Sequence, residues 1–179
     1  MGNEIDMIVS NSGPLIHLAK IDQLELLKKL FGKVIIPHDV ELEVVDRGKE
    51  EGNADAFMIE SEIEKGWISV ESGNGAKIKE IAESAGIDIG EASAIMLAKG
   101  RKFPILIDDL AARRFAAGMG LEVVGSIGVL IRSARMGKIL KSEALEALDK
   151  LARVMWLSVD IYEDARKAIE SLETMKNNP

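Results

Sequence analysis

The chain has 179 residues, a net charge of −7, no cysteine and only two histidines. This length fits one domain with a sizeable core, and the lack of cysteine excludes disulfides, thiolate metal sites and cysteine nucleophiles. The scarcity of histidine disfavours a histidine-rich zinc site, so a bound metal would take oxygen ligands, as Mg²⁺ or Mn²⁺ does. No apolar run reaches the roughly 20 residues of a membrane span, and no secretory signal opens the chain. We therefore expect a cytoplasmic protein without membrane contact.

Short apolar runs alternate with amphipathic stretches along the chain. We predict strands at 6–10, 33–36, 67–70, 104–107 and 121–124, and helices at 14–20, 24–31, 38–46, 54–65, 76–84 and 90–99, then after each of the last two strands, and in a tail at 142–154 and 161–175. The polar run 48–53 is expected to connect two helices. This alternation predicts an α/β fold with a mostly parallel sheet flanked by helices. We expect one main domain over 1–140, with a helical extension at 141–179 packed on it.

Acidic and amide side chains follow several of the predicted strands. Asp108 and Asp109 end the fourth strand, Asn11 follows the first, Glu43 lies on the helix after the second, and Glu91 opens a helix. In an open parallel sheet the carboxyl ends of the strands share one edge, so these side chains are expected to converge. Adjacent carboxylates repel each other unless a cation compensates. Clustered carboxylates can bind a divalent cation that activates water for attack on phosphorus.

Each of these acids also has a purely structural interpretation. Glu43 alone would be a solvated helix residue, and Glu91 would complement the positive end of its helix dipole. One of Asp108 and Asp109 would cap the next helix. The sequence leaves both interpretations open for each residue.

Basic residues are concentrated around the paired aspartates. Residues 101–141 hold eight basic residues and three acids, which gives this segment a net charge of +5 against −12 for the rest of the chain. The excess is either a set of solvated helix faces or a basic rim that attracts a phosphate backbone toward an acidic centre.

Two further polar side chains have expected roles of their own. Ser126, in the run Gly-Ser-Ile-Gly, is expected to cap the following helix, and the free N–H groups there offer a phosphate site. His17 lies on a largely apolar helix face, where we expect it to be partly buried and hydrogen-bonded.

Taken together, several segments resemble the PIN-domain proteins, the fold of the VapC-type toxin ribonucleases. They are IVSNSGPLIHLAKI at 8–21, LFGKVIIPHDVELEV at 30–44, GEASAIMLA at 90–98, ILIDDLAARRFA at 105–116 and GLEVVGSIGVL at 120–130. The chain is most similar to an uncharacterised archaeal and bacterial branch of that family. The resemblance implies a three-layer α/β sandwich and an endoribonuclease dependent on Mg²⁺ or Mn²⁺.

The resemblance also assigns roles to particular residues. Glu43, Glu91, Asp108 and Asp109 fill the family's acidic catalytic positions, and the metal would be held by Asn11, Glu91, Asp108 and Asp109. Nucleic acid would be contacted by Arg113, Ser126 and Arg132. The first strand of the family usually ends in Asp-x-Ser, whereas this chain has Asn11 and Gly13 at those positions. A neutral amide binds a cation less tightly than a carboxylate, so the resemblance leaves the activity open.

The same resemblance bears on partners. It implies RNA as the substrate, an antitoxin protein as a binding partner, and a homodimer. We predict a partner groove near residues 37–66, where apolar residues alternate with charged ones; the apolar residues are Val40, Val44, Phe57, Ile59 and Ile63.

Three classes of function have features in common with this sequence. The first is a toxin-like, metal-dependent ribonuclease, and the second is a catalytically impaired module that binds RNA or a protein partner. The third is a phosphoacceptor signalling domain, which also places acids at strand ends but requires a lysine after a later strand that this chain lacks. Cleavage that depends on added manganese distinguishes the first class from the others.

Overall fold

The computed structural model describes residues 7–72 and 77–172. The predicted element ends at Asp6, at Ala76 and at 173–175 lie outside these ranges. The elements in chain order are β1 (Met7–Ser10), α1 (Ser12–Lys20), α2 (Glu25–Phe31), β2 (Lys33–Pro37), α3 (His38–Glu41), the π-helical turn η1 (Leu42–Arg47), α4 (Gly48–Glu50), α5 (Ala54–Glu64), β3 (Ile68–Glu71), α6 (Ile78–Ala85), α7 (Ile89–Arg101), β4 (Ile105–Leu106), α8 (Leu110–Gly118), β5 (Val123–Val124), α9 (Ser126–Arg135), α10 (Lys141–Met155) and α11 (Val159–Glu170).

The strands form one parallel sheet in the order β3-β2-β1-β4-β5. The register pairs Val9 of β1 with Ile35 of β2 on one side and with Ile105 of β4 on the other. Parallel sheets are covered on both faces, so their strands are continuously apolar rather than alternating. The predicted α/β fold with a parallel sheet is confirmed.

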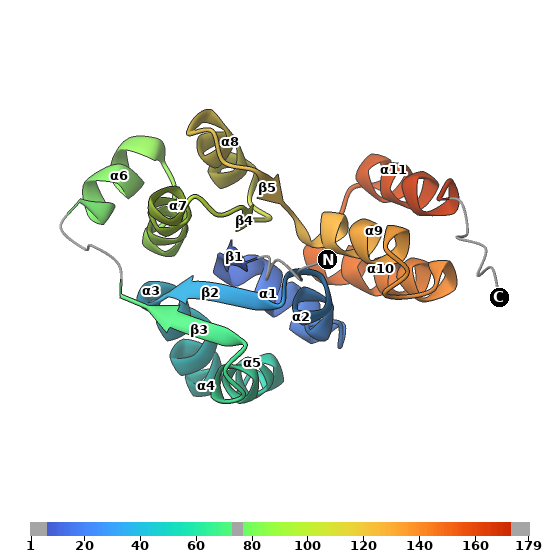
Figure 1. The fold of residues 1–179 in the computed structure, drawn as a ribbon, viewed down its shortest axis with the longest axis horizontal. Helices are drawn as coiled ribbons and strands as arrows, with labels where there is room; N and C mark the ends of the chain where they lie inside the picture. Colours follow the sequence, from blue (N-terminus) through green and yellow to red (C-terminus); the bar gives the residue numbers. More distant parts are fainter. Residues whose placement is uncertain (1–6, 73–76, 173–179) are drawn as a thin grey trace, which may run out of the picture.

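Successive strand residues supply two different cores, because side chains of a strand point alternately to opposite faces. Ile8 and Leu106 belong to the larger core, whereas Val9, Ile105 and Ile107 belong to the smaller one. Helices α1, α2, α9 and α10 contribute to the larger core, and α7 and α8 to the smaller. The sheet is therefore the middle layer of a three-layer sandwich (Figure 1).

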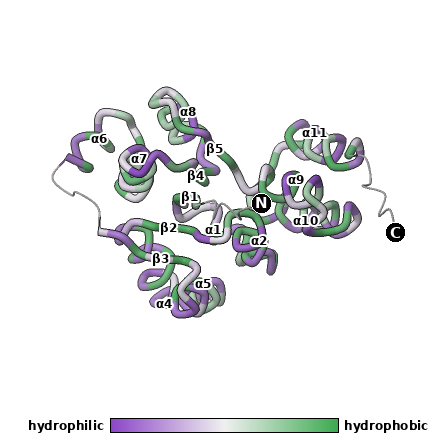
Figure 2. Tube along the Cα trace, in the orientation of Figure 1, coloured by the Kyte–Doolittle hydropathy of each residue, from purple (hydrophilic) through white to green (hydrophobic). Residues whose placement is uncertain are grey.

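The C-terminal helices extend the larger core. Ala144, Leu148 and Leu151 of α10 are buried there, together with Ala165 and Ile169 of α11. Figure 2 shows hydrophobic and hydrophilic residues alternating along α10 and α11, as expected for helices that bury one face. The division of the chain at residue 140 remains a prediction.

The connection predicted at 48–53 is wrong in its first residues. The helix that begins at His38 continues through η1 and α4 to Glu50. Close packing explains the continuation: a Cβ at Gly48 would lie 2.8 Å from the Cβ of Ala56 in α5, so only glycine allows this approach of the two helices. The chain leaves the helix at Gly52, where φ is +75°.

The apolar residues expected to face a partner mostly face the core instead. Val40, Val44 and Ile59 are buried, and Ile63 packs partly against the same core. Phe57 alone of this set is exposed, and the ammonium of Lys49 lies 5.4 Å from the centre of its ring. Val40, Val44, Ile59 and Ile63 therefore pack against the core rather than lining a groove, and a partner surface near residues 37–66 stays a prediction.

No helix within the described stretches is both long and apolar enough to cross a membrane.

Candidate active site at the carboxyl edge of the sheet

Asn11, Glu43 and the pair Asp108 and Asp109 follow β1, β2 and β4, which are neighbours in the sheet, and Glu91 lies in α7, which leads into β4. The backbone N–H of Asn11 donates to the carbonyl of Leu106, so the ends of β1 and β4 lie side by side. The acids beyond these ends are divided between two groups, which we call the Asp108 network and the Glu91 group. The Asp108 network consists of His17, Asp108 and Ser126, and the Glu91 group consists of Asn11, Glu43, Asp88, Glu91 and Asp109.

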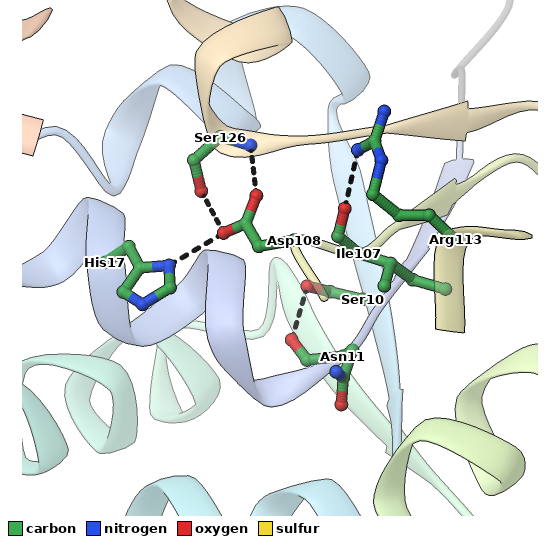
Figure 3. A network of polar contacts seen from close by, with 7 residues as sticks. All are labelled: Ser10, Asn11, His17, Ile107, Asp108, Arg113 and Ser126. Atoms are coloured by element: carbon green, nitrogen blue, oxygen red, sulfur yellow. Dashed lines mark hydrogen bonds and ion pairs between the residues drawn. The ribbon is translucent and has the colours of Figure 1, made fainter. Parts of the chain in front are cut away.

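Every oxygen of Asp108 has a donor. Its Oδ1 accepts from the backbone N–H of Ser126 at 2.7 Å, and its Oδ2 accepts from the Ser126 hydroxyl at 2.6 Å. The Nδ1 of His17 lies 2.7 Å from the same Oδ2 (Figure 3). The Asp108 side chain is only 7% exposed. Asp108 therefore occupies the anion site at the start of α9, where a phosphate had been expected.

Ser126 corrects a prediction and His17 confirms one. Ser126 does not cap α9, because it is the first helical residue and its hydroxyl donates to Asp108. His17 is partly buried and hydrogen-bonded, as expected. The His17–Asp108 contact joins residues 91 positions apart, and no local pattern in the sequence indicates it.

The basic residues assigned to nucleic acid already have partners within the chain. The guanidinium of Arg113 donates to the carbonyl of Ile107 at 2.8 Å, and that of Arg132 donates to Glu122 at 2.6 Å. A Cβ at Gly125 would lie 2.6 Å from Arg113 Nη1 and 3.1 Å from Asp108 Oδ1. Glycine at 125 thus permits Arg113 and Asp108 to approach the same turn. Contact of Arg113 or Arg132 with RNA stays a prediction.

Three acids of the Glu91 group take part in helix capping, and for Glu91 and Asp109 this agrees with their structural interpretation. Asp109 Oδ1 accepts from the N–H of Ala112 at 2.9 Å and caps α8. Glu91 completes a capping box on α7: its own N–H donates to Asp88 Oδ1 at 2.6 Å, and its Oε2 accepts from the N–H of Asp88 at 3.0 Å. Such boxes satisfy two N–H groups at the start of a helix.

Glu91 nevertheless carries more than a capping role. Burial raises the pKa of its carboxyl above the ordinary value of 4.5, the hydrogen bond from the Asp88 backbone lowers it, and the charges of Asp88, Asp109 and Glu43 raise it further. Three neighbouring carboxylates therefore act on one buried acid. Like charges arranged in this way are unfavourable without a cation and are characteristic of functional sites.

Glu43 reaches the same place from the π-helical turn. Its Oε2 accepts from the Ser12 hydroxyl at 2.6 Å, directly beyond Asn11. A Cβ at Gly90 would lie 3.3 Å from that Oε2 and 3.4 Å from Asp88 Oδ1. Glycine at the start of α7 thus leaves room for the two carboxylates. Single π-turns inside helices occur frequently at functional sites.

Asn11 contributes an unsatisfied oxygen. The residue is 5% exposed, and its Oδ1 has no hydrogen-bond partner. In Figure 3 its amide points away from the Asp108 carboxylate. A buried carbonyl oxygen without a donor costs about 1–3 kcal/mol, and a cation would satisfy it.

The candidate metal-binding oxygens do not converge on a single point. Within residues 7–72 and 77–172, no three histidine or acidic side chains lie close enough together to hold a metal ion. The side chains of Glu43, Glu91 and Asp109 instead bond to Ser12 and to helix N–H groups. The donor chemistry, oxygen throughout with one orphaned amide, still fits Mg²⁺ or Mn²⁺.

Comparison with known proteins identifies the fold. A family model described as "PIN domain" matches residues 7–171. The chain belongs to the PIN-domain family. The matched range includes α10 and α11, so the family relationship extends over the C-terminal helices of this PIN domain.

A solved structure is similar as well. The crystal structure of PAE2754 from Pyrobaculum aerophilum superposes with a TM-score of 0.54 at 16% identity, covering 74% of this chain and 98% of that one. This likeness concerns the fold alone. The search of curated proteins found no match. PIN domains are generally nucleases and usually use divalent metals, so the family membership of this chain is consistent with the predicted nuclease class.

Proposed function

We propose that this PIN domain is a toxin-like endoribonuclease that hydrolyses RNA phosphodiesters with Mg²⁺ or Mn²⁺. The observation that carries the proposal is the orphaned, buried Oδ1 of Asn11 at the sheet edge where the Glu91 group gathers. A divalent cation would coordinate the unpaired amide oxygen and would also compensate the repulsion among the carboxylates.

Asn11, Glu43, Glu91 and Asp109 would hold the cation. Asp109 is favoured over Asp108, because one oxygen of Asp109 remains without a hydrogen bond whereas both oxygens of Asp108 accept from donors. Asp109 also acts on the pKa of Glu91, which places it with the Glu91 group. Glu43 and Glu91 would exchange their present bonds for the cation.

When bound, such a cation lowers the pKa of its water and stabilises the charge that develops on the phosphate. The surrounding residues of the chain position the carboxylates. Ser12 holds Glu43 by its hydroxyl, and the backbone of Asp88 holds Glu91. The Asp108 network joins the end of β4 to the start of α9, beside these carboxylates. Arg113, Ser126 and Arg132 remain proposed contacts to RNA.

Cleavage of single-stranded RNA tests the proposal. The wild-type protein is expected to cleave when Mn²⁺ or Mg²⁺ is added and to stop when EDTA removes it. Thermal unfolding should show a matching stabilisation by Mn²⁺, since a ligand that binds only the folded state raises its stability. Absence of both cleavage and stabilisation contradicts the proposal.

A second candidate is a non-catalytic module that binds RNA or an antitoxin-like protein. Two observations favour it: the residue at the end of β1 is a neutral Asn11, and the acids of the described chain form no closed metal-binding set. This candidate predicts binding without Mn²⁺-dependent cleavage. A homodimer remains part of both candidates and is tested by light scattering at micromolar concentration.

A further inference from the structure

A cavity of about 490 Å³ opens beside the Glu91 group, between η1, α6 and the start of α7. Glu43, Asp88 and Gly90 form the wall that it shares with the site. Its volume lies within the roughly 300–1,000 Å³ range of small-molecule sites. A ligand in this cavity would therefore contact Glu43, one of the carboxylates proposed to hold the cation.

Exposed apolar side chains line part of this cavity. Leu42 is 37% exposed and Ile89 is 46% exposed, although most large apolar residues of the described chain are in the two cores. Ile87 lines the same wall. An apolar surface inside a concave site is suited to a flat, apolar ligand face such as that of a nucleobase.

Two cations stand on different helices around the cavity. Arg47 belongs to η1 and Lys79 to α6, and both are exposed. Neither forms an ion pair with a carboxylate of the described chain, whereas Arg101 and Arg132 do. Unpaired cations on two sides of a cavity suit the phosphates on either side of one nucleotide.

Carboxylates form the rest of the lining, and their hydrogen-bonding capacity indicates which bases the cavity can bind. Glu83 of α6 lines the cavity and makes no hydrogen bond to another described residue, and Asp39 and Asp88 also line it. Carboxylates accept hydrogen bonds but cannot donate them. They therefore match the exocyclic amino groups of adenine, cytosine and guanine, whereas uracil has no exocyclic amino group and its carbonyl oxygens would repel them.

We propose that this cavity binds one RNA nucleotide adjacent to the scissile phosphate and selects against uridine. The base lies on Leu42 and Ile89, the flanking phosphates contact Arg47 and Lys79, and an exocyclic amino group donates to Glu83. The position next to the scissile phosphate rests on the proposed function, whereas the binding itself does not. Charge counting along the sequence indicates residues 101–141 instead and misses Arg47 and Lys79, which lie outside that segment.

Binding of eight-nucleotide RNAs tests the inference. The affinities of oligo(A), oligo(C) and oligo(U) are measured by fluorescence anisotropy in EDTA, so that cleavage does not interfere. Arg47→Ala and Lys79→Ala are compared with Arg135→Ala and Lys138→Ala, which remove the same charge at the end of α9. Figure 1 shows α6 and α9 at opposite ends of the molecule.

We expect each single cavity variant to weaken RNA binding about fivefold or more. In the double variant, the slope of log affinity against log salt concentration should fall in magnitude by about 1.4, the value for two phosphate contacts on a single strand. The α9 variants should bind as the wild type does. Oligo(A) and oligo(C) should bind about fivefold or more tightly than oligo(U), as one hydrogen bond to a charged group allows. Glu83→Gln should diminish that preference.

Wild-type affinity in the double variant, an equal loss in the α9 variants, or no binding by the wild type overturns the inference. The inference is also overturned if the double variant keeps its RNA affinity and binds an arginine-rich octapeptide more tightly than the wild type does. The cavity would then fit a basic protein partner. Equal affinities for the three RNAs overturn the assignment of Glu83. Cleavage with Mn²⁺ is assayed separately, so failure of the nuclease proposal and failure of this inference give different results.

Discussion

The Asp108 network and the Glu91 group lie at the same edge of one sheet but are built on opposite principles. In the first, a buried carboxylate receives a helix N–H, a hydroxyl and an imidazole, and its charge is compensated within the chain. In the second, burial and three neighbouring carboxylates raise the pKa of Glu91, and a neighbouring amide oxygen has no partner. Satisfied polar networks stabilise a fold, and unsatisfied ones indicate where a ligand binds.

This contrast separates acids that look equivalent in the sequence. Asp108 and Asp109 are adjacent, yet Asp108 belongs to the closed network, whereas the charge of Asp109 acts on the pKa of Glu91.

Glu91→Gln should have the largest effect. It removes the most buried carboxylate of the Glu91 group while keeping an acceptor for the Asp88 backbone. RNA cleavage with Mn²⁺ is expected to fall by about 100-fold or more, as for removal of an electrostatic catalytic group. Initial rates measure this change, and Glu170→Gln, on the exposed pair with Arg166, is the control. Cleavage at the wild-type rate would show that Glu91 acts only as a cap.

His17→Ala should destabilise the fold and leave metal binding intact. The loss of a hydrogen bond to a buried carboxylate is expected to lower the free energy of unfolding by about 1.5–3 kcal/mol. Gly13 offers a matched rescue, because a Cβ there would lie 3.9 Å from Asp108 Oδ2 and 3.7 Å from His17 Cε1.

A serine hydroxyl at position 13 can then replace the imidazole as a donor to Asp108. Urea unfolding of His17→Ala and of the double variant with Gly13→Ser measures the recovery. If the added serine restores no stability, the effect of His17 comes from packing rather than from the Asp108 network.

Asn11→Asp should strengthen the open group toward metal. A charged ligand in place of the amide is expected to tighten Mn²⁺ binding about tenfold, which corresponds to about 1.4 kcal/mol, and to raise cleavage. The metal-free protein should lose stability, since one more like charge joins the carboxylates. Calorimetric titration with Mn²⁺ measures the first effect and thermal unfolding in EDTA the second. Unchanged values for both would reduce Asn11 to a turn residue.

The pH dependence of the metal-free protein gives the smallest effect. Glu91 has a raised pKa in the folded state, so the folded chain binds this proton more tightly than the unfolded chain does. Its contribution to stability is present below the ordinary value of 4.5 and declines as pH rises through the folded pKa. Urea unfolding in EDTA should show this decline in the wild type and not in Glu91→Gln. The same decline in both would exclude Glu91 as its source.

Much of the fold follows from local sequence patterns. The runs that form β1, β2 and β4 are apolar except at Ser10 and Lys33, which fits burial of a parallel strand on both faces. The helical residues Gly48–Glu50 are missed because their polar composition favours a loop. A tertiary contact, Gly48 against Ala56, decides their conformation instead.

The sequence predicts which acids belong to the site, but it does not predict how their side chains are arranged. Chain order places Asn11 and Asp108 at one sheet edge, and capping rules allow roles for Glu91 and Asp109. The pairing of His17 with Asp108 joins α1 to the end of β4, and no periodic pattern encodes it. The one available signal is Gly13, which precedes His17 by one helical turn and leaves space beside Asp108.

The most direct test of the division compares Asp108→Asn with Asp109→Asn by thermal unfolding, with and without Mn²⁺. Asp108→Asn should lower the metal-free melting temperature by about 4–8 °C, the equivalent of about 2 kcal/mol in a chain of this size, and retain the Mn²⁺ stabilisation. Asp109→Asn should keep the metal-free melting temperature, since asparagine also caps helices, and lose most of the Mn²⁺ stabilisation. The opposite assignment of the two effects, or equal effects in both variants, would contradict the account.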